Sequence, residues 1–566
     1  MPKQWVSSGR PDRLRPDDGR EAPAGDLVRT PAPSRRRVLA TRPRRALAAL
    51  LAGALPVFAF PAPGLWWFAY VALVPWMLLL RSAPTGRRAA LEGWLGGVGF
   101  VVAVHHWLMP SLHVFIVVLA ALLGLLWLPW GVLVRFLLGG RPTARRAAAA
   151  VAVLPSGWLM VELARSWEAL GGPWGLLGSS QWDVTAALRL ASLGGVWLVT
   201  LLVVAVNTAV VVLLTLRHAR TAALCALLGC AVLAGTGRFL APLPAAERTA
   251  RVAVVQPGIF DGDGSAGQRL ARSEELTRTL AGERVDLVVW GESSVGEDLV
   301  ARPDVAARIT ALSRALDTYL LVNVDARRSD RPGIFKSSVL VGPEGPTGAR
   351  YDKMRLVPFG EYVPARALLG WATSVGKAAG EDRMRGTAPV VMALPNGLRP
   401  GPLVCFESAF PDMSRRLVRD GADLLIAQSA TSTFQHSWAP EQHATLAALR
   451  AAESGRPMVH ATLTGVSSVY GPDGRRIGRP LSTDRSAAAV YEVPLAAGLT
   501  PYARYGDWAV HLALAALALL LAAEGMRRLR KPVPGPSVPR ARTARAWRAR
   551  RGHRAASAPV RSPGTR

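Results

Sequence analysis

Three short strings in the second half of the chain place a carboxylate, an ammonium and a thiol where they could act together. Glu292 ends the apolar run 288–290, and Cys405 ends the apolar run 403–404. Lys353 lies in the aromatic, Pro- and Gly-punctuated string 351–364, in a chain that has only five lysines. A thiol with a pKa of about 8.5 needs a nearby base to become a nucleophile at neutral pH. The tetrahedral intermediate that it forms needs a cation or amide N–H groups at its oxyanion. These residue types therefore indicate nucleophilic catalysis at a carbonyl group.

Each of these residues also has a structural interpretation. An acid at a strand end is often a cap or a surface group, and a single lysine can simply have survived in an arginine-rich sequence. A lone cysteine is most often a buried small hydrophobe. The position of Cys405 at a strand-to-loop transition favours the nucleophile, because such turns expose a side chain to substrate.

The segment that holds these residues alternates between strand and helix patterns. Strands are expected at 252–256, 285–290, 320–324, 338–341, 390–394, 403–406, 424–427 and 458–462, and helices near 268–282 and 302–316. Gly-Pro turns at 342–345 and 471–474 separate them. The pattern predicts an α/β layered domain over 241–507, with active-site residues at strand ends.

Apolar segments flank this domain on both sides. They cover 46–61, 64–80, 91–109, 114–138, 147–164, 194–216, 221–240 and 508–525, and several reach the ~20 residues that span a bilayer. The expected organisation is a disordered basic tail 1–42, seven transmembrane helices in 43–240, the domain 241–507, an eighth helix 508–525 and a disordered basic tail 526–566. Arginines follow the second, fourth and sixth segments, so the positive-inside rule places both termini in the cytoplasm and the domain outside.

The formal net charge of +29 comes largely from the two tails. Residues 1–45 hold twelve basic and five acidic residues, and residues 526–566 hold thirteen basic and no acidic residues. Nucleic-acid binding is one interpretation of such tails. Anchoring beside membrane helices is favoured, because apolar segments begin and end next to the tails. We therefore expect a plasma-membrane protein with no nucleic-acid partner.

The three cysteines provide no disulfide framework and no zinc spacing in the α/β segment. Cys225 and Cys230 lie in an apolar helix, which leaves Cys405 as the only thiol of that segment. Neither a cofactor nor a metal is expected.

The order Glu292, Lys353, Cys405, each at or after a strand, resembles the nitrilase superfamily. The string 351–364, framed by membrane helices, resembles its membrane-embedded branch, the bacterial apolipoprotein N-acyltransferases. The strings 172–175 with 179–181 and 499–504 agree with that family, and the resemblance covers about 46 to 525. It implies an extracytoplasmic α-β-β-α sandwich domain on a polytopic helical membrane domain.

The resemblance also implies roles for individual residues. Glu292 matches the general base, Lys353 the charge-stabilising lysine, Cys405 the nucleophile and Glu361 a second, supporting glutamate. The backbone N–H of Phe406 is a further candidate for the oxyanion, and Glu407 beside it is expected to support the site. The implied reaction moves a fatty acyl chain from a phospholipid to a Cys405 thioester, and then to the α-amine of a diacylglyceryl-modified cysteine of a lipoprotein.

Some strings depart from the family. Asparagines that members often show are missing from 428–434 and from 461–466. These departures leave open a non-catalytic or accessory paralogue, and a membrane-tethered amidase that uses water as acceptor is a further alternative. Glu162, inside a predicted span, is either a functional group or the ion-pair partner of Arg165.

Overall fold

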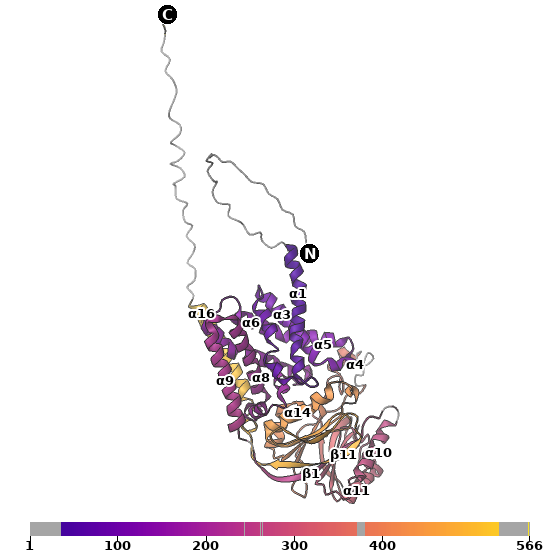
Figure 1. Ribbon diagram of the computed structural model, residues 1–566. Coiled ribbons are helices and arrows are strands. Elements are labelled where there is room, and N and C mark those ends of the chain that lie inside the picture. Colours follow the sequence, from indigo (N-terminus) through magenta and orange to yellow (C-terminus); the bar gives the residue numbers. More distant parts are fainter. Residues whose placement is uncertain are drawn as a thin grey trace, which may run out of the picture.

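The protein consists of a helical domain and a two-sheet domain that pack against each other (Figure 1). The structure is a computed structural model that describes residues 35–242, 244–260, 262, 264–370, 380–530 and 564. The tail predictions for 1–34 and for most of 531–566 lie outside the described residues. Helix α1 begins at Arg35, inside the stretch expected to be a tail, and α16 continues to Leu529.

The helical domain precedes the sheets in the chain, and one further helix follows them. Its α-helices are α1 (Arg35–Ala54), α2 (Val74–Arg81), α3 (Gly86–Val104), α4 (Met109–Leu112), α5 (Phe115–Gly124), α6 (Leu128–Leu138), α7 (Ala144–Arg165), α8 (Thr185–Thr215), α9 (Arg220–Leu240) and α16 (Trp508–Leu529). Short 3-10 helices lie between them: η1 (Leu55–Ala59), η2 (Trp66–Tyr70), η3 (His106–Leu108), η4 (Leu125–Trp127), η5 (Glu168–Leu170), η6 (Leu177–Gln181) and η7 (Arg217–Ala219). The end of α1 where the chain enters and the end of α16 where it leaves lie away from the sheets (Figure 1).

Within the described ranges, five helices are long and apolar enough to cross a membrane, or six if the bent pair Gly86–Val104 and His106–Leu112 is one span. The eight expected segments are therefore too many by this measure. Residues 55–73 form short 3-10 helices and turns, because Pro61 and Pro63 lack amide donors and Gly64 has a φ of 63°. The second expected segment therefore forms only the short apolar helix Trp66–Arg81. The first expected segment shares the 20-residue helix α1 with six arginines and Pro43, so it fails through its charge and not its length. The remaining six correspond to these candidate spans, with the bent pair counted as one.

The two-sheet domain has four layers, with helices on the outer face of each sheet. The first sheet has the order β11-β1-β2-β3-β4-β5, and the second has the order β10-β9-β8-β7-β6. The strands of the first sheet are β1 (Ala246–Gln256), β2 (Leu287–Trp290), β3 (Tyr319–Arg327), β4 (Ile334–Gly342), β5 (Gly345–Asp352) and β11 (Ala487–Ala496). Those of the second are β6 (Pro400–Val404), β7 (Leu424–Ser429), β8 (Met458–Thr462), β9 (Ser467–Tyr470) and β10 (Arg476–Leu481). The helices are α10 (Ser265–Arg278), α11 (Pro303–Leu316), α12 (Arg366–Leu369), α13 (Pro411–Arg419), α14 (Ala439–Ser454) and α15 (Pro501–Tyr505), with the 3-10 helices η9 (Cys405–Ala409) and η10 (Ser432–Phe434).

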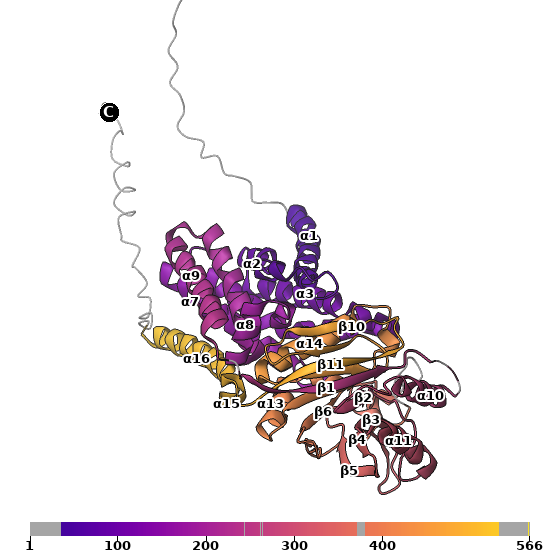
Figure 2. The same cartoon turned by 60° about the horizontal axis from the view of Figure 1, so that its bottom comes forward.

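Three apolar layers hold this domain together. Val254, Leu287 and Ile426 belong to the layer between the two sheets. The outer face of the first sheet packs on α10 and α11, which lie farthest from the helical domain (Figures 1 and 2). The outer face of the second sheet packs on α13 and α14. The strands β1, β2 and β3 pair in parallel, as do β6, β7 and β8, and β2 and β8 are buried along their whole length. Strands buried on both faces read as continuous apolar runs, which is why these were predicted.

Several predicted elements differ from the structure. Residues 390–394 form no regular strand, although the N–H groups of Met392 and Leu394 donate to Pro400 O and Leu398 O, both at 2.9 Å. The strands β5, β9, β10 and β11 were not predicted. The other predicted strands and both predicted helices are present, with shifted boundaries.

Helix α14 lies between the second sheet and the helical domain, where it caps a broken membrane helix (Figure 1). Helix α8 has non-helical dihedral angles at Gly194 and Gly195, which leaves the N–H of Val196 without a helical partner. Glu453 of α14 accepts a hydrogen bond from this N–H at 2.8 Å, and Arg450 pairs with the same carboxylate at 2.7 Å. Both side chains are buried. The two domains therefore share a buried polar contact in addition to their chain connections.

Candidate active site

The ends of strands from both sheets bring Glu292, Lys353 and Cys405 to one place. Glu292 follows β2, Lys353 follows β5 and Cys405 follows β6. The N–H of Glu292 donates to Ser429 O at 3.2 Å, and Cys405 Sγ lies 4.0 Å from the carbonyl oxygen of the next residue, Ala430. Lys353 Nζ is 3.3 Å from Glu292 Oε1. The three residues that the sequence singled out are therefore neighbours around the end of β7.

The backbone at Cys405 makes a sharp turn. Cys405 has a φ of 51°, which is uncommon for a residue with a side chain. The chain changes there from the extended β6 to the 3-10 helix η9. Such strained strand-to-helix turns occur where a nucleophile must project from the sheet.

The site contains a second lysine that the sequence interpretation missed. Lys336 Nζ lies 2.8 Å from Glu292 Oε1 and 3.1 Å from Glu361 Oε1. Lys353 Nζ lies closer to Glu361, at 2.8 Å, than to Glu292. Two ammonium groups and two carboxylates thus form one buried cluster. Lysine scarcity applied equally to Lys336, but the strand was expected to begin only at 338, so Lys336 was not placed on it.

Charges and burial act in opposite directions on the ionisable groups of this cluster. Burial raises the pKa of Glu292, but the ammonium groups of Lys336 and Lys353 outweigh it and hold the pKa below its ordinary value. Burial also opposes the charge of Glu361, whose pKa the same two lysines lower to about 2. Burial and then the Glu292 charge raise the pKa of Cys405 to about 12, against the influence of Lys353. The resting state is therefore a neutral thiol beside an ionised carboxylate.

Glu407 joins the loop that carries Lys353 to the strand that carries Cys405. Its Oε1 accepts hydrogen bonds from the Tyr351 hydroxyl and the Met354 N–H, both at 2.7 Å, and from the Arg355 N–H at 3.0 Å. Its Oε2 accepts from the Val404 N–H at 2.8 Å. Burial raises the pKa of Glu407. The position of Glu407 suits a supporting role, because it fixes the distance between the lysine loop and the nucleophile turn.

Phe406 lies where the sheets meet the helical domain. Its ring packs against Phe410 at 4.9 Å and against the backbone of Gly172, where an added Cβ would come 2.6 Å from the ring. The indole N–H of Trp174, in the same string 172–175, donates to Gln442 of α14 at 3.0 Å. That string therefore packs beside the nucleophile turn.

Glu162 and Arg165 hold this part of the helical domain together. Glu162 accepts hydrogen bonds from the Leu177 N–H and the Thr200 hydroxyl, at 2.7 and 2.9 Å. Arg165 donates to the carbonyl oxygens of Trp174 and Gly175. Both side chains fasten the loop at 172–177 to the membrane helices.

The residues that depart from the family pattern make structural hydrogen bonds. Gln428 Nε2 donates to the carbonyl oxygens of Trp290 and Leu321, at 2.8 and 3.1 Å, and so joins the two sheets. The N–H of Thr431 donates to Thr464 O at 2.9 Å. These contacts support the strand ends around the thiol.

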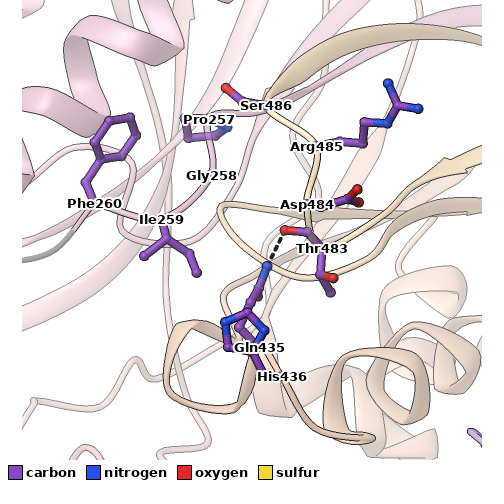
Figure 3. Close-up of a pocket in the computed structure, with 10 residues that line it drawn as sticks. All are labelled: Pro257, Gly258, Ile259, Phe260, Gln435, His436, Thr483, Asp484, Arg485 and Ser486. Carbon is purple, nitrogen blue, oxygen red and sulfur yellow. Dashed lines mark hydrogen bonds between the residues drawn. The ribbon is translucent and has the colours of Figure 1, made fainter.

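A cavity of about 460 Å³ opens at the end of β1 (Figure 3). It is lined by Pro257, Gly258, Ile259, Phe260, Gln435, His436, Thr483, Asp484, Arg485 and Ser486. Its walls come from the loop after β1, the segment after η10 and the turn between β10 and β11. The sequence interpretation did not select these residues for a site, and gave His436 no role.

The fold and the site define the class of the protein. A carbon-nitrogen hydrolase family profile matches residues 251–498, and a profile for the apolipoprotein N-acyltransferase N-terminal domain matches residues 52–209. Among solved structures, an amidase of the nitrilase superfamily from Nesterenkonia AN1 has a TM-score of 0.34 and 18% identity, covering 48% of this chain and 98% of that chain. The two-sheet domain is a nitrilase-superfamily domain, as predicted.

Curated relatives extend over both domains. Apolipoprotein N-acyltransferase from Azotobacter vinelandii is 33% identical over 87% of this chain and 97% of its own. The enzymes of the same name from Geobacter metallireducens and Pseudomonas aeruginosa are 31% and 32% identical, covering 84% and 86% of this chain. The chain belongs to the apolipoprotein N-acyltransferase family, and it is an acyltransferase with a membrane location. The predicted family, fold class and enzyme class are confirmed.

Proposed function

We propose that the protein transfers a fatty acyl chain from a phospholipid to the α-amine of the diacylglyceryl-modified cysteine of lipoproteins, through a thioester on Cys405. The observation that carries the mechanism is the convergence of Glu292, Lys353 and Cys405 at strand ends beside the helical domain. The curated relatives support the acceptor, because their name specifies an apolipoprotein and N-acylation. The apolar helices support a lipid donor, since both substrates carry acyl chains.

In the first half-reaction Cys405 Sγ attacks the ester carbonyl carbon of the phospholipid. Its proton passes to Glu292, and Lys353 Nζ with the Phe406 N–H stabilises the oxyanion. The carbon–oxygen bond then breaks, and Glu292 returns the proton to the leaving alkoxide of the lysophospholipid. Because the pKa of Cys405 is about 12 and that of Glu292 is lowered, proton transfer must accompany the attack rather than precede it.

In the second half-reaction the free α-amine of the lipoprotein cysteine attacks the thioester. Glu292 accepts a proton from the amine, the carbon–sulfur bond breaks and Cys405 regains a proton as the amide forms. Glu361 holds the ammonium of Lys353 at 2.8 Å, and Glu407 holds the loop behind it. These two glutamates therefore position groups and exchange no proton with substrate.

The arrangement of charges supports a catalytic domain on the extracytoplasmic side and both termini in the cytoplasm. Three connections between helices of the helical domain carry arginines: Arg81 and Arg87 between α2 and α3, Arg141 and Arg145 between α6 and α7, and Arg217 between α8 and α9. The start of α1 and the end of α16 lie away from the two-sheet domain (Figure 1). The positive-inside rule assigns these arginine-bearing connections, and with them the two termini, to the cytoplasmic side. If the bent pair Gly86–Val104 and His106–Leu112 is one span, five spans precede the sheets, and seven precede them if the first two segments also cross. The number is odd in both of these cases, which supports a domain on the side opposite to the N-terminus.

The test follows an acyl label through the full-length protein in detergent or lipid. Phospholipid with a labelled acyl chain should give a hydroxylamine-sensitive label on the protein, which Cys405→Ala abolishes. Addition of a diacylglyceryl-cysteinyl peptide should move the label to the peptide N-terminus, as read by mass spectrometry. Release of free fatty acid to water instead would identify an amidase-like hydrolase, and no label at all would indicate an accessory protein.

A further inference from the structure

The cavity at the end of β1 contains a buried polar group without a partner. Gln435 is 4% exposed, and its Nε2 donates to Thr483 O at 2.5 Å (Figure 3). Its Oε1 has no hydrogen-bond partner among the described residues. A buried acceptor that lacks a donor is unfavourable. A ligand that brings an N–H group into the cavity would remove this cost.

The other walls of the cavity suit a polypeptide. Ile259 is 40% exposed, and Phe260 lies beside it in the loop after β1 (Figure 3). An apolar wall next to a lone acceptor matches the side chains and the amide N–H of an extended peptide. A fully ionised phosphate group offers acceptors only, so it cannot satisfy Gln435 Oε1. Asp484 and Arg485 both line the cavity and carry opposite charges, so the lining favours no net charge on the ligand.

The segment that supplies Gln435 to the cavity also contacts the nucleophile turn and the helical domain. Ala430, whose carbonyl oxygen is 4.0 Å from Cys405 Sγ, stands five residues before Gln435 in the chain. Phe434 packs on Trp107 with ring centroids 4.9 Å apart, and Trp438 packs on His106 at 4.5 Å. The segment that carries Gln435 thus runs from the thiol along the bent pair of membrane helices.

We propose that this cavity binds the polypeptide that follows the modified cysteine of the lipoprotein acceptor, with a peptide N–H donating to Gln435 Oε1. The proposal rests on the proposed function, because it assumes a lipid-anchored peptide whose N-terminal amine reaches the thioester. A chain anchored in the bilayer by its first residue would pass the segment 430–438 as it leaves the membrane. The cavity then contributes to binding of the peptide acceptor and does not contribute to binding of the phospholipid donor.

The two half-reactions separate these roles. The full-length protein is loaded with a labelled phospholipid, and transfer is then timed to synthetic acceptors with one or six residues after the diacylglyceryl-cysteine. We expect the longer acceptor to be preferred about tenfold in kcat/KM, which corresponds to about 1.4 kcal/mol. In Gln435→Leu and in Ile259→Ser this preference should shrink severalfold. Formation of the acyl-enzyme and transfer to the short acceptor should remain unchanged.

Val300→Ser is the matched control, because Val300 is a 72% exposed apolar residue of the same domain, outside the cavity. Equal use of both acceptors by the wild-type protein, or an unchanged preference in Ile259→Ser, would overturn the proposal. Slower acyl-enzyme formation in the cavity variants would assign the cavity to the phospholipid headgroup instead. Failure of the wild-type protein to form any acyl-enzyme would count against the proposed function itself.

A separate observation concerns the two lysines. Lys336 Nζ is 2.8 Å from Glu292 and Lys353 Nζ is 2.8 Å from Glu361, while the cross distances are 3.1 and 3.3 Å. We infer that Lys336 is the positioning residue that holds Glu292. Lys353, which is held by Glu361, is then free to stabilise the oxyanion of the reacting carbonyl. Lys336 is itself held on β4, where Asp325 of β3 pairs with it in register and lies 3.8 Å from its ammonium.

The pH dependence of acyl-enzyme formation tests this division. The charged or titratable groups around Glu292 are Lys336, Lys353, Glu361, Cys405 and His443. Lys336→Met removes a positive charge that stabilises the ionised base, so the acidic limb of the rate profile should move to higher pH. Lys336→Arg should restore part of the wild-type profile. An equal loss of rate at every pH would show that Lys336 serves the fold alone.

Discussion

Glu407→Gln is the most direct test of how the site is held together. The substitution preserves the shape of the side chain and removes its charge and one acceptor atom. The amide oxygen can replace Oε1 and keep the hydrogen bonds from Tyr351, Met354 and Arg355. The amide NH2 then faces the N–H of Val404, where the carboxylate accepted at 2.8 Å. One hydrogen bond is lost, and two donors oppose each other in a fully buried place.

The magnitude follows from these contacts. A hydrogen bond to a charged group contributes about 1.5–3 kcal/mol, and a buried unsatisfied donor costs about 1–3 kcal/mol. We therefore expect the two-sheet domain to lose about 3–5 kcal/mol of stability, and its melting temperature to fall on the order of 10 °C. Because Met354 directly follows Lys353, the loop should also shift the ammonium. A displacement of about 1 Å can cost about a hundredfold in rate.

Two assays read the two effects. Thermal unfolding of the detergent-solubilised protein gives the stability, and labelled phospholipid gives the rate of acyl-enzyme formation below the melting temperature. Glu492→Gln, an exposed position on β11, is the control for the same chemical change. A wild-type melting temperature in Glu407→Gln would refute the hydrogen-bond reasoning. A lowered melting temperature with a wild-type rate would refute the positioning of Lys353 by this residue.

Three further predictions follow from the same region. With the pKa of Cys405 at about 12, iodoacetamide at pH 8 should alkylate it about a thousandfold more slowly than a free thiol of pKa about 8.5, as measured by mass spectrometry; labelling at the free-thiol rate would contradict the buried, neutral thiol. Burial lowers the pKa of His443 to about 4, so between pH 6.5 and 4 the unfolded chain binds a proton that the folded chain does not. The free energy of unfolding should therefore fall by about 3 kcal/mol as the pH is lowered over this range. His443→Gln should remove that part of the pH dependence of the melting temperature. An added Cβ at Gly291 would lie 1.9 Å from the backbone nitrogen of Leu463, so Gly291→Ala should cost about 3 kcal/mol and reduce the yield of folded protein, whereas Gly267→Ala, in open space, should not.

The sequence predicted those parts of the site that follow apolar strands. The apolar runs before Glu292 and Cys405 are continuous because β2 and β6 are buried on both faces. The ends of these two strands could therefore be predicted from the sequence. Lys336 was missed because three consecutive polar residues, 336–338, interrupt the apolar run of β4, although none of them is exposed. The strand β5 was missed because most of its residues are not buried. Which carboxylate each lysine prefers depends on distances between strands, and no spacing in the chain contains that information.

The limits of hydropathy explain the other differences. The run 390–394 is apolar enough for a strand, yet it makes only two hydrogen bonds with 398–400, too few for a regular strand. The second apolar segment has the composition of a membrane span but forms only the short helix Trp66–Arg81, and the first segment shares helix α1 with six arginines. The cavity at Gln435 combines the segments 257–260, 435–436 and 483–486, which are far apart in the chain. Its lining has no common pattern, and only the folded arrangement reveals it.

The capping of the broken helix α8 by Glu453 bears on how the protein can be dissected. A recombinant fragment containing only 241–507 would present the Glu453 carboxylate and the Arg450 guanidinium to water, together with apolar side chains of α14 that now face α8. Such an excised fragment would lack the membrane helix on which it is seated, and we expect it to aggregate. Coexpression of the two halves as separate polypeptides should instead allow them to reassemble, because the break in α8 presents the N–H of Val196 to Glu453.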